Sequence, residues 1–203
     1  MERVVRNDSI AGHSFSLEAK SVGSGGKAET KETDNAENAS LTYHHNTTIP
    51  AAALVHTTTR NQENTEALEV RIRNFSPHPD AAHCEWYFIA KSPEKQRFVW
   101  DHGVRDFQFM SNAESVMNLK SAPLTQTLTR ETKIGVGTDP STGGPVVSNR
   151  TGSVSRTGSH PYGWILRLMA GEQVLKVQAS SEELRADGLD QERLDALMKA
   201  GGQ

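Results

Sequence analysis

A stretch of alternating apolar residues near the C-terminal end, Tyr162 to Ser180, constrains the possible folds most strongly. Its apolar positions repeat with a period of two, with Trp164, Leu166 and Leu168 on one face and Ile165 and Met169 on the other. Ala170 to Gln173 then separate this arm from a second one, so the pattern predicts a β-hairpin. Because Arg167 alone interrupts the apolar first arm, we expect that arm to lie inside a sheet.

Two further segments show the same period. In EALEVRIRNF, one face carries Leu68, Val70 and Ile72 and the other Glu69, Arg71 and Arg73, which is typical of a strand with one wet face. In HCEWYFIAK, Cys84, Trp86, Phe88 and Ala90 alternate with Tyr87 and Ile89, which predicts a central strand. Weaker signals predict strands at 13–19 and 49–59, a hairpin at 97–110 with its turn at 101–103, and an exposed strand at 119–134. The fold class predicted is an all-β, immunoglobulin-like two-sheet sandwich.

Apolar residues make up only 35% of the 203 positions and aromatic residues 6%. The polar residues concentrate in two runs, Ser21 to Thr48 and Gly135 to His160, which have little apolar surface to offset the cost of ordering. We expect the first run to be a mobile loop or a weak edge strand. The second is expected to be a long flexible loop or a loose hairpin.

After the hairpin, the spacing of the apolar residues changes from that of a strand to that of a helix. Ser180 and Glu183 have capping-box spacing, and Leu189, Leu194, Leu197 and Met198 follow with helical spacing before Gly201. This predicts one short C-terminal helix. The domain scheme is therefore an N-terminal strand and polar segment over 1–48, a sandwich over 49–180 and a helical tail over 181–203.

Charge and cysteine content narrow the classes of partner. The 22 Lys and Arg against 25 Asp and Glu give a net charge of −3, which provides no long-range attraction for nucleic acid. A single cysteine, Cys84, excludes an intrachain disulfide and is expected to fill the core. The first residues show no signal peptide, which fits a cytosolic protein or an exported one presented without its leader.

Catalytic and metal-binding motifs are not found. No G-x-S-x-G elbow, phosphate loop or H-E-x-x-H is present. His44 and His45, and His78 and His83 near Glu85, invite a metal site, but strand neighbours such as His83 and Cys84 point to opposite faces. The carboxylates of the first polar run, Glu29, Glu32, Asp34 and Glu37, lack calcium-loop spacing. We therefore predict a protein that is not an enzyme and has no catalytic residue, metal or cofactor.

Four aromatic residues admit two interpretations. Trp86, Tyr87, Trp100 and Trp164 could stack on sugar rings if they lay on an exposed face. Since all four belong to the most apolar strands, core packing is the favoured interpretation. A glycan-binding sandwich remains the alternative function.

The segments EALEVRIRNF, CEWYFIAK and YGWILRLMAGEQVLKVQASSEEL resemble a family of immunoglobulin-like surface proteins of verrucomicrobial bacteria that are associated with type IV pili. The resemblance covers roughly Ala67 to Leu184. Trp86 and Tyr162 match the core tryptophan and tyrosine corner of such sandwiches, although the paired cysteines of antibody domains are missing. The resemblance implies a location in the cell envelope, at the outer membrane or cell surface, and a role in pilus assembly or adhesion through contacts with pilus or other envelope proteins.

Self-association is a further expectation. An alternating strand ahead of the polar run at Ser21 is well placed to be exchanged between copies. A homo-oligomer formed in this way should contain fewer subunits when Met1 to Lys20 are deleted.

Overall fold

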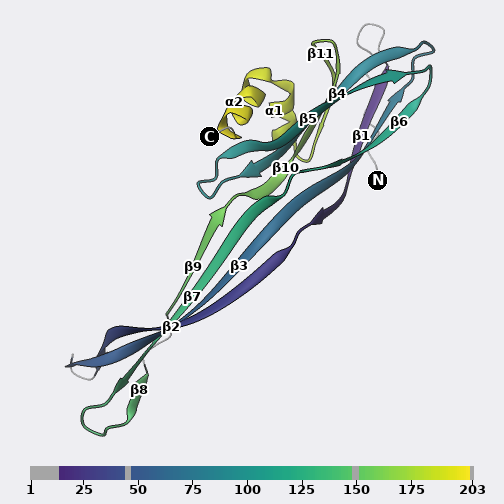
Figure 1. The fold of residues 1–203 in the computed structure, drawn as a ribbon. Coiled ribbons are helices and arrows are strands. Elements are labelled where there is room, and N and C mark those ends of the chain that lie inside the picture. The colour runs from purple at the N-terminus through teal and green to yellow at the C-terminus, as the bar shows by residue number, and fades with distance from the viewer. Residues whose placement is uncertain (1–13, 44–46, 148–150, 202–203) are drawn as a thin grey trace. The chain divides into compact units, whose positions relative to one another are not determined.

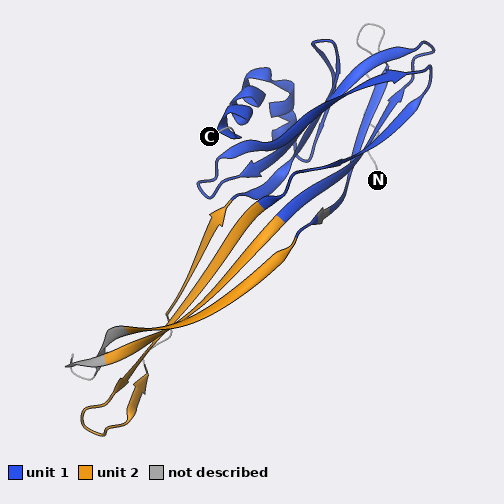
Figure 2. Ribbon diagram, viewed as in Figure 1, with its two compact units in different colours: residues 1–26, 64–124, 159–203 blue, residues 27–63, 125–158 orange. Residues whose placement is uncertain are grey.

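The computed structural model describes residues 14–43, 47–147 and 151–201. These residues fall into two compact units, which are coloured separately in Figure 2. Unit 1 comprises Met1–Gly26, Asn64–Leu124 and Ser159–Gln203, and unit 2 comprises Lys27–Glu63 and Thr125–Gly158. The described residues form an all-β structure apart from two short helices near the C-terminal end.

Unit 1 contains two antiparallel sheets. The first joins β1 (Phe15–Gly25), the second part of β3 (Thr47–Asn74) and β6 (Glu114–Lys120), with β3 in the middle. The second has the order β11–β10–β4–β5 and consists of β4 (Asp80–Lys91), β5 (Arg97–Phe109), β10 (His160–Ala170) and β11 (Gln173–Ala179). The predicted hairpin is confirmed, because β10 pairs with β11 from Ile165 opposite Ala179 to Ala170 opposite Gln173.

The apolar faces of these two sheets form one core, which confirms the predicted sandwich. One sheet contributes alternate residues of β3, and the other contributes alternate residues of β4 and β10. The buried side chains include Leu68, Val70, Ile72, Cys84, Phe88, Trp164, Leu166 and Leu168. Phe15 of β1 packs edge-on against Phe109 of β5, with ring centroids 5.3 Å apart. The alternation seen in the sequence therefore reports the buried faces directly.

The outer face of the four-stranded sheet has its own core under the helices. α1 (Glu182–Leu189) and α2 (Gln191–Gly201) lie beside β5 and β10, as Figure 1 shows. Their residues Leu184, Leu194 and Leu197 pack against Ile89, Val99 and Ile165. This third layer explains why β4 and β10 are apolar on both faces.

Unit 2 is one antiparallel sheet with little buried side-chain surface. It joins β2 (Ala28–Tyr43), the first part of β3, β7 (Leu124–Thr138), β8 (Pro145–Val147) and β9 (Thr151–Gly158). Residues 28–37 of β2 and every residue of β9 are exposed. Backbone pairing, rather than apolar burial, organises this unit.

In the described residues, both polar runs therefore form mostly paired strands. Ser21 to Thr48 contains the end of β1, all of β2 and the start of β3, and Gly135 to His160 contains the end of β7, β8, β9 and the start of β10. Of the two alternatives given for each run, the mobile loop is wrong. For Ser21 to Thr48 the alternative of an edge strand agrees with β2, and for Gly135 to His160 the hairpin alternative agrees with the paired strands β7, β8 and β9. Composition predicted little burial correctly, but a strand can be held by its ladder, and Thr suits a pleated chain. The predicted boundary between 48 and 49 falls inside β3, which also unites the two strands expected at 49–59 and 66–75.

The turn predicted at 101–103 is also wrong, since β5 runs straight through it. Gly103 pairs with Trp86 across the strands, and a Cβ on Gly103 would lie 2.3 Å from Cζ2 of the Trp86 indole. The glycine is needed because a large ring lies over it.

The C-terminal tail forms two helices instead of the one predicted. Asp190 has an extended backbone, and its Oδ1 accepts hydrogen bonds from the backbone N–H groups of Glu192 and Arg193 at 3.0 and 3.2 Å. It therefore ends one helix and caps the next. The first cap is Ser181 rather than Ser180, because the Ser180 hydroxyl accepts a hydrogen bond from the Trp164 N–H.

Candidate functional site

The outer face of the four-stranded sheet also carries a polar cluster, which adjoins the core under the helices. His83, Glu85 and Tyr87 alternate along β4, and Arg167 of β10 pairs in register with Glu85. Alternation places these side chains on the face opposite Cys84 and Phe88. The prediction that His83 and Cys84 point apart is confirmed, since Cys84 is in the sandwich core.

Arg167 is the centre of this cluster and is buried. Its Nη1 lies 3.2 Å from Oε2 of Glu85 and donates to Oε1 of Gln191 at 2.8 Å. Its Nε has no hydrogen-bond partner among the described residues. Since Gln191 begins α2, the arginine joins the sheet to that helix.

The neighbouring groups are not in states that favour catalysis at neutral pH. Burial, followed by the charge of Glu85, raises the pKa of the Tyr87 phenol to about 12, and the phenol donates to Glu85 Oε2 at 3.0 Å. Burial likewise raises the pKa of the Cys84 thiol to about 12. His83 Nε2 is 3.7 Å from Glu85 Oε1, which is too long for a hydrogen bond. The cluster therefore offers neither an activated nucleophile nor a base hydrogen-bonded to one.

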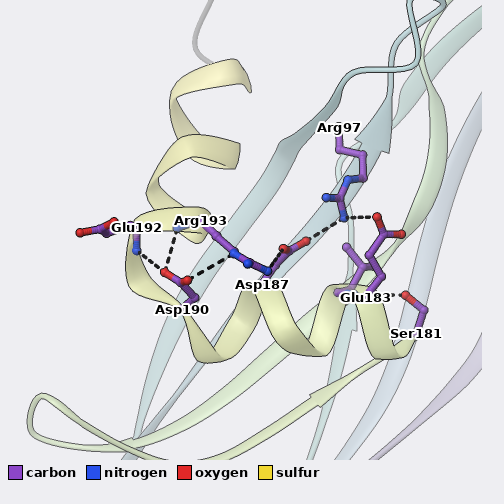
Figure 3. Close-up of polar contacts among 8 residues, drawn as sticks. Arg97, Ser181, Glu183, Asp187, Asp190, Glu192 and Arg193 are labelled. Carbon is purple, nitrogen blue, oxygen red and sulfur yellow. Dashed lines mark hydrogen bonds and ion pairs between the residues drawn. The ribbon is translucent and has the colours of Figure 1, made fainter.

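A second polar cluster lies where the helices meet β5. Arg97 reaches from β5 to two carboxylates of α1, with Nη1 2.7 Å from Asp187 Oδ2 and 3.2 Å from Glu183 Oε1, as Figure 3 shows. Arg193 of α2 approaches Asp187 Oδ1 at 3.9 Å and Asp190 Oδ2 at 3.3 Å. The Tyr162 hydroxyl donates to Glu183 at 2.6 Å, and this bond, with the charge of Arg97, lowers the pKa of Glu183.

A pocket of about 410 Å³ opens beside this second cluster, lined by Gln96, Arg97, Asp187, Arg193, Ala196, Leu197 and Ala200. Its two arginines are already engaged by carboxylates of the same chain. The buried carboxylate of Asp187 in turn needs the positive charge beside it. We interpret the cluster as a latch that holds the helices on the sheet.

The four aromatic residues considered as sugar platforms contribute to the two cores of unit 1, Trp164 as a buried residue and Trp86, Tyr87 and Trp100 as partly buried ones. Trp164 is 9% exposed and lies in the sandwich core, and Trp86 and Trp100 pack against that core. The Trp100 ring lies 5.8 Å from Phe88, and its Nε1 donates to the Ala122 carbonyl. With Tyr87 engaged by Glu85, this arrangement favours core packing over sugar stacking.

The residues considered as metal ligands are dispersed. Glu29, Glu32, Asp34 and Glu37 are spaced along the exposed strand β2, where Oδ1 of Asp34 lies 2.7 Å from Nδ1 of His56. His78 lies in the bend before β4, and His44 and His45 lie outside the described residues. Within 14–43, 47–147 and 151–201, no three His, Cys, Asp or Glu side chains are grouped to hold a metal ion.

The open edges of unit 2 are the remaining candidate. In the part of the chain that the structure describes, β2 pairs only with β3 and β9 pairs only with β7. Each strand therefore has one edge without a strand neighbour, where backbone N–H and C=O groups can receive another strand. No described helix is long and apolar enough to span a bilayer.

Sequence reasoning singled out His83, Glu85 and Tyr87 for other roles, and it did not predict that they form a cluster around Arg167. Arg167 stood out as a charge inside an apolar arm, and it is the buried centre of the first cluster. Arg97 and Asp187 are ninety positions apart in the chain, and no local pattern marks them as partners.

Comparison with known proteins adds little. No family model and no curated protein matches this chain. Among solved structures, the ApaA protein from Bordetella pertussis is similar over 63% of this chain and 92% of its own, with 15% identity and a TM-score of 0.20. That TM-score is too low for the similarity to support any conclusion about fold or function.

Proposed function

We propose that the protein is a non-enzymatic component of the cell surface or outer membrane that serves type IV pilus assembly or adhesion through protein–protein contacts. The sequence resemblance suggests the setting. The observation that supports contact as the mode of action is the pair of open strand edges in unit 2. Adding a strand to such an edge gives affinity through main-chain hydrogen bonds.

The edge of β9 is the better receptor of the two. β2 carries Glu29, Lys31, Glu32, Asp34 and Glu37 among its exposed residues, whereas β9, with the sequence TGSVSRTG, carries only Arg156. Charged side chains on an edge strand discourage pairing with another chain. β9 combines hydroxyl and β-branched residues with little charge, and we assign the docking edge to it.

A matched pair of double variants tests this assignment in the source bacterium. Ser153→Lys with Ser155→Lys adds two charges to β9, and Thr33→Lys with Asn35→Lys adds the same two charges to β2. We expect the β9 variant to reduce the amount of protein that co-purifies with pili by about tenfold or more, since each charge must be desolvated or repelled on pairing. The β2 variant should leave it nearly unchanged.

Cells without pili provide the second arm of this test. The proposal expects the surface level or the localisation of the protein to change when pili are removed. Unchanged level and localisation, together with equal co-purification of both double variants, would refute it.

A further inference from the structure

The basic side chains of unit 2 are sorted by face. β7 pairs with β9 so that Leu128 lies opposite Arg156 and Arg130 lies opposite Val154. Side chains alternate along each strand, so Arg130, Leu128 and Arg156 share one face. Arg60 of β3 belongs to the same face, because it lines a common hollow with Leu128 and Arg156.

The lysines lie on the opposite face. Lys133 follows Arg130 by an odd number of positions in β7, and its Nζ is 3.2 Å from Glu131 and 3.7 Å from Glu37. Lys31 and Glu37 are six positions apart in β2, which pairs with β3 without a register shift, so their side chains lie on the same face. These lysines therefore lie on the face that carries Glu37 and Glu131, and the three arginines lie on the other face.

The hollow on the arginine face is lined mainly by side chains that can donate hydrogen bonds. It has a volume of about 200 Å³ and is lined by Arg60, Gln62, Gln126, Leu128 and Arg156. Among the described residues, no carboxylate lies within 4.0 Å of Arg60, Arg130 or Arg156. The carboxylates on this face belong to β2, where Asp34 bonds to His56.

We propose that this face binds an acidic polysaccharide, with sulfate groups held by Arg60 and Arg156 and further groups reached by Arg130. A guanidinium group presents a planar fork of donors that matches sulfate and carboxylate oxygens in pairs. The amide of Gln126 provides donors and an acceptor of the kind that sugar hydroxyls need. This site uses side chains on one face of the sheet, including Arg156 of β9, rather than the backbone edge of β9, and it does not depend on the proposed function.

Two other anionic partners fit the face less well. Single-stranded nucleic acid binds with aromatic rings stacked on its bases, and the described side chains of the arginine face include no phenylalanine, tyrosine or tryptophan. An acidic protein segment would need apolar anchors to fill pockets, and this hollow offers only Leu128 as an apolar lining residue.

Binding of the full-length protein to dextran sulfate tests the proposal, with uncharged dextran and duplex DNA as comparison ligands. The informative variant is Arg60→Gln with Arg156→Gln. The matched control is Lys31→Gln with Lys133→Gln, which removes the same charge from the other face. Dissociation constants from titration calorimetry at low and physiological salt give the readout, and circular dichroism checks that both variants are folded.

We expect wild-type protein to bind dextran sulfate, with affinity falling as salt rises. The arginine variant should bind at least about tenfold more weakly, which is the effect of losing about 1.4 kcal/mol. The lysine variant should differ from wild type by less than about twofold. No binding to dextran sulfate, equal losses in both variants, or equal arginine-dependent binding of duplex DNA would each overturn the proposal.

Discussion

At the scale of single residues, Arg97 and Arg193 differ in how much charge compensation each gives to the buried carboxylate of Asp187. Arg97 faces the Asp187 carboxylate, which is only 7% exposed, whereas the side chain of Arg193 is 61% exposed and lies 3.9 Å from the same carboxylate. Removing the first leaves a buried charge almost without compensation. Removing the second leaves Asp187 with its shorter ion pair.

We therefore expect Arg97→Ala to lower the free energy of unfolding by about 2 kcal/mol, below the range for a fully buried pair because Arg97 is partly exposed. Arg193→Ala, the matched control, should cost less than about 1 kcal/mol. Urea unfolding monitored by tryptophan fluorescence measures both. Equal losses of unfolding free energy in the two variants would contradict the interpretation that the Arg97–Asp187 pair holds the helices on the sheet.

At the scale of elements, the spacing between helix and sheet depends on a glycine. Gly188 is buried in α1, and a Cβ there would lie 2.6 Å from Cγ2 of Ile165 and 2.9 Å from Cγ1 of Val177. The helix can approach β10 and β11 so closely only because that side chain is missing. Intrinsic helix propensity and packing therefore make opposite demands at this position.

For Gly188→Ala, we expect a net loss of about 1–2 kcal/mol in unfolding free energy, because the strain of overpacking exceeds the gain of about 1 kcal/mol in helix propensity. Chemical denaturation of the variant measures this loss. Ala186→Gly, at an exposed position of the same helix, gives the propensity term alone and should cost about 1 kcal/mol. A stabilised Gly188→Ala protein would show that α1 does not pack as described.

At the scale of the whole molecule, the two units differ in what holds them together. Unit 1 has a sandwich core and a second core under its helices. In unit 2, the only buried large apolar residue that the structure describes is Val55. A strand ladder exposed on both faces opens at a lower free energy than one covered by apolar layers.

Hydrogen exchange measured by mass spectrometry should therefore separate the units. Backbone amides of β7 and β9 are expected to exchange about tenfold or more faster than those of β4 and β10 under native conditions. Peptides from β6, a strand of unit 1 that is about as short as β9, show whether strand length alone changes the exchange rate. Uniform protection across both units would contradict this account of unit 2.

The N-terminal arm has a role in unit 1 that its sequence did not reveal. β1 pairs with β3 of its own chain from Phe15 opposite Asn74 onward, and Phe15 is buried in the sandwich core. Deleting Met1 to Lys20 would remove this core residue, so a lower stability is now expected of that deletion. Exchange of the arm between copies stays a prediction that light scattering of the wild-type protein can test.

The sequence by itself determined which faces of the central strands are buried, because a period of two with apolar side chains needs no knowledge of the partner strand. Leu68, Val70, Ile72 and the Trp164 to Leu168 arm all lie where that period puts them. It also showed where burial is scarce. It did not show that the polar runs are strands, since a ladder is satisfied by a backbone partner distant in sequence, which composition does not reveal.

Only the tertiary structure determined which residues form the two polar clusters and which face of unit 2 each basic residue occupies. Arg97 contacts Asp187 because a helix folds back onto β5, and Arg60 and Arg156 line one hollow because strands distant in sequence lie in one sheet. The same holds for Gly103, whose missing side chain makes sense only once the Trp86 ring lies over it. Such contacts depend on which segments become neighbours in space, and local sequence patterns describe each segment alone.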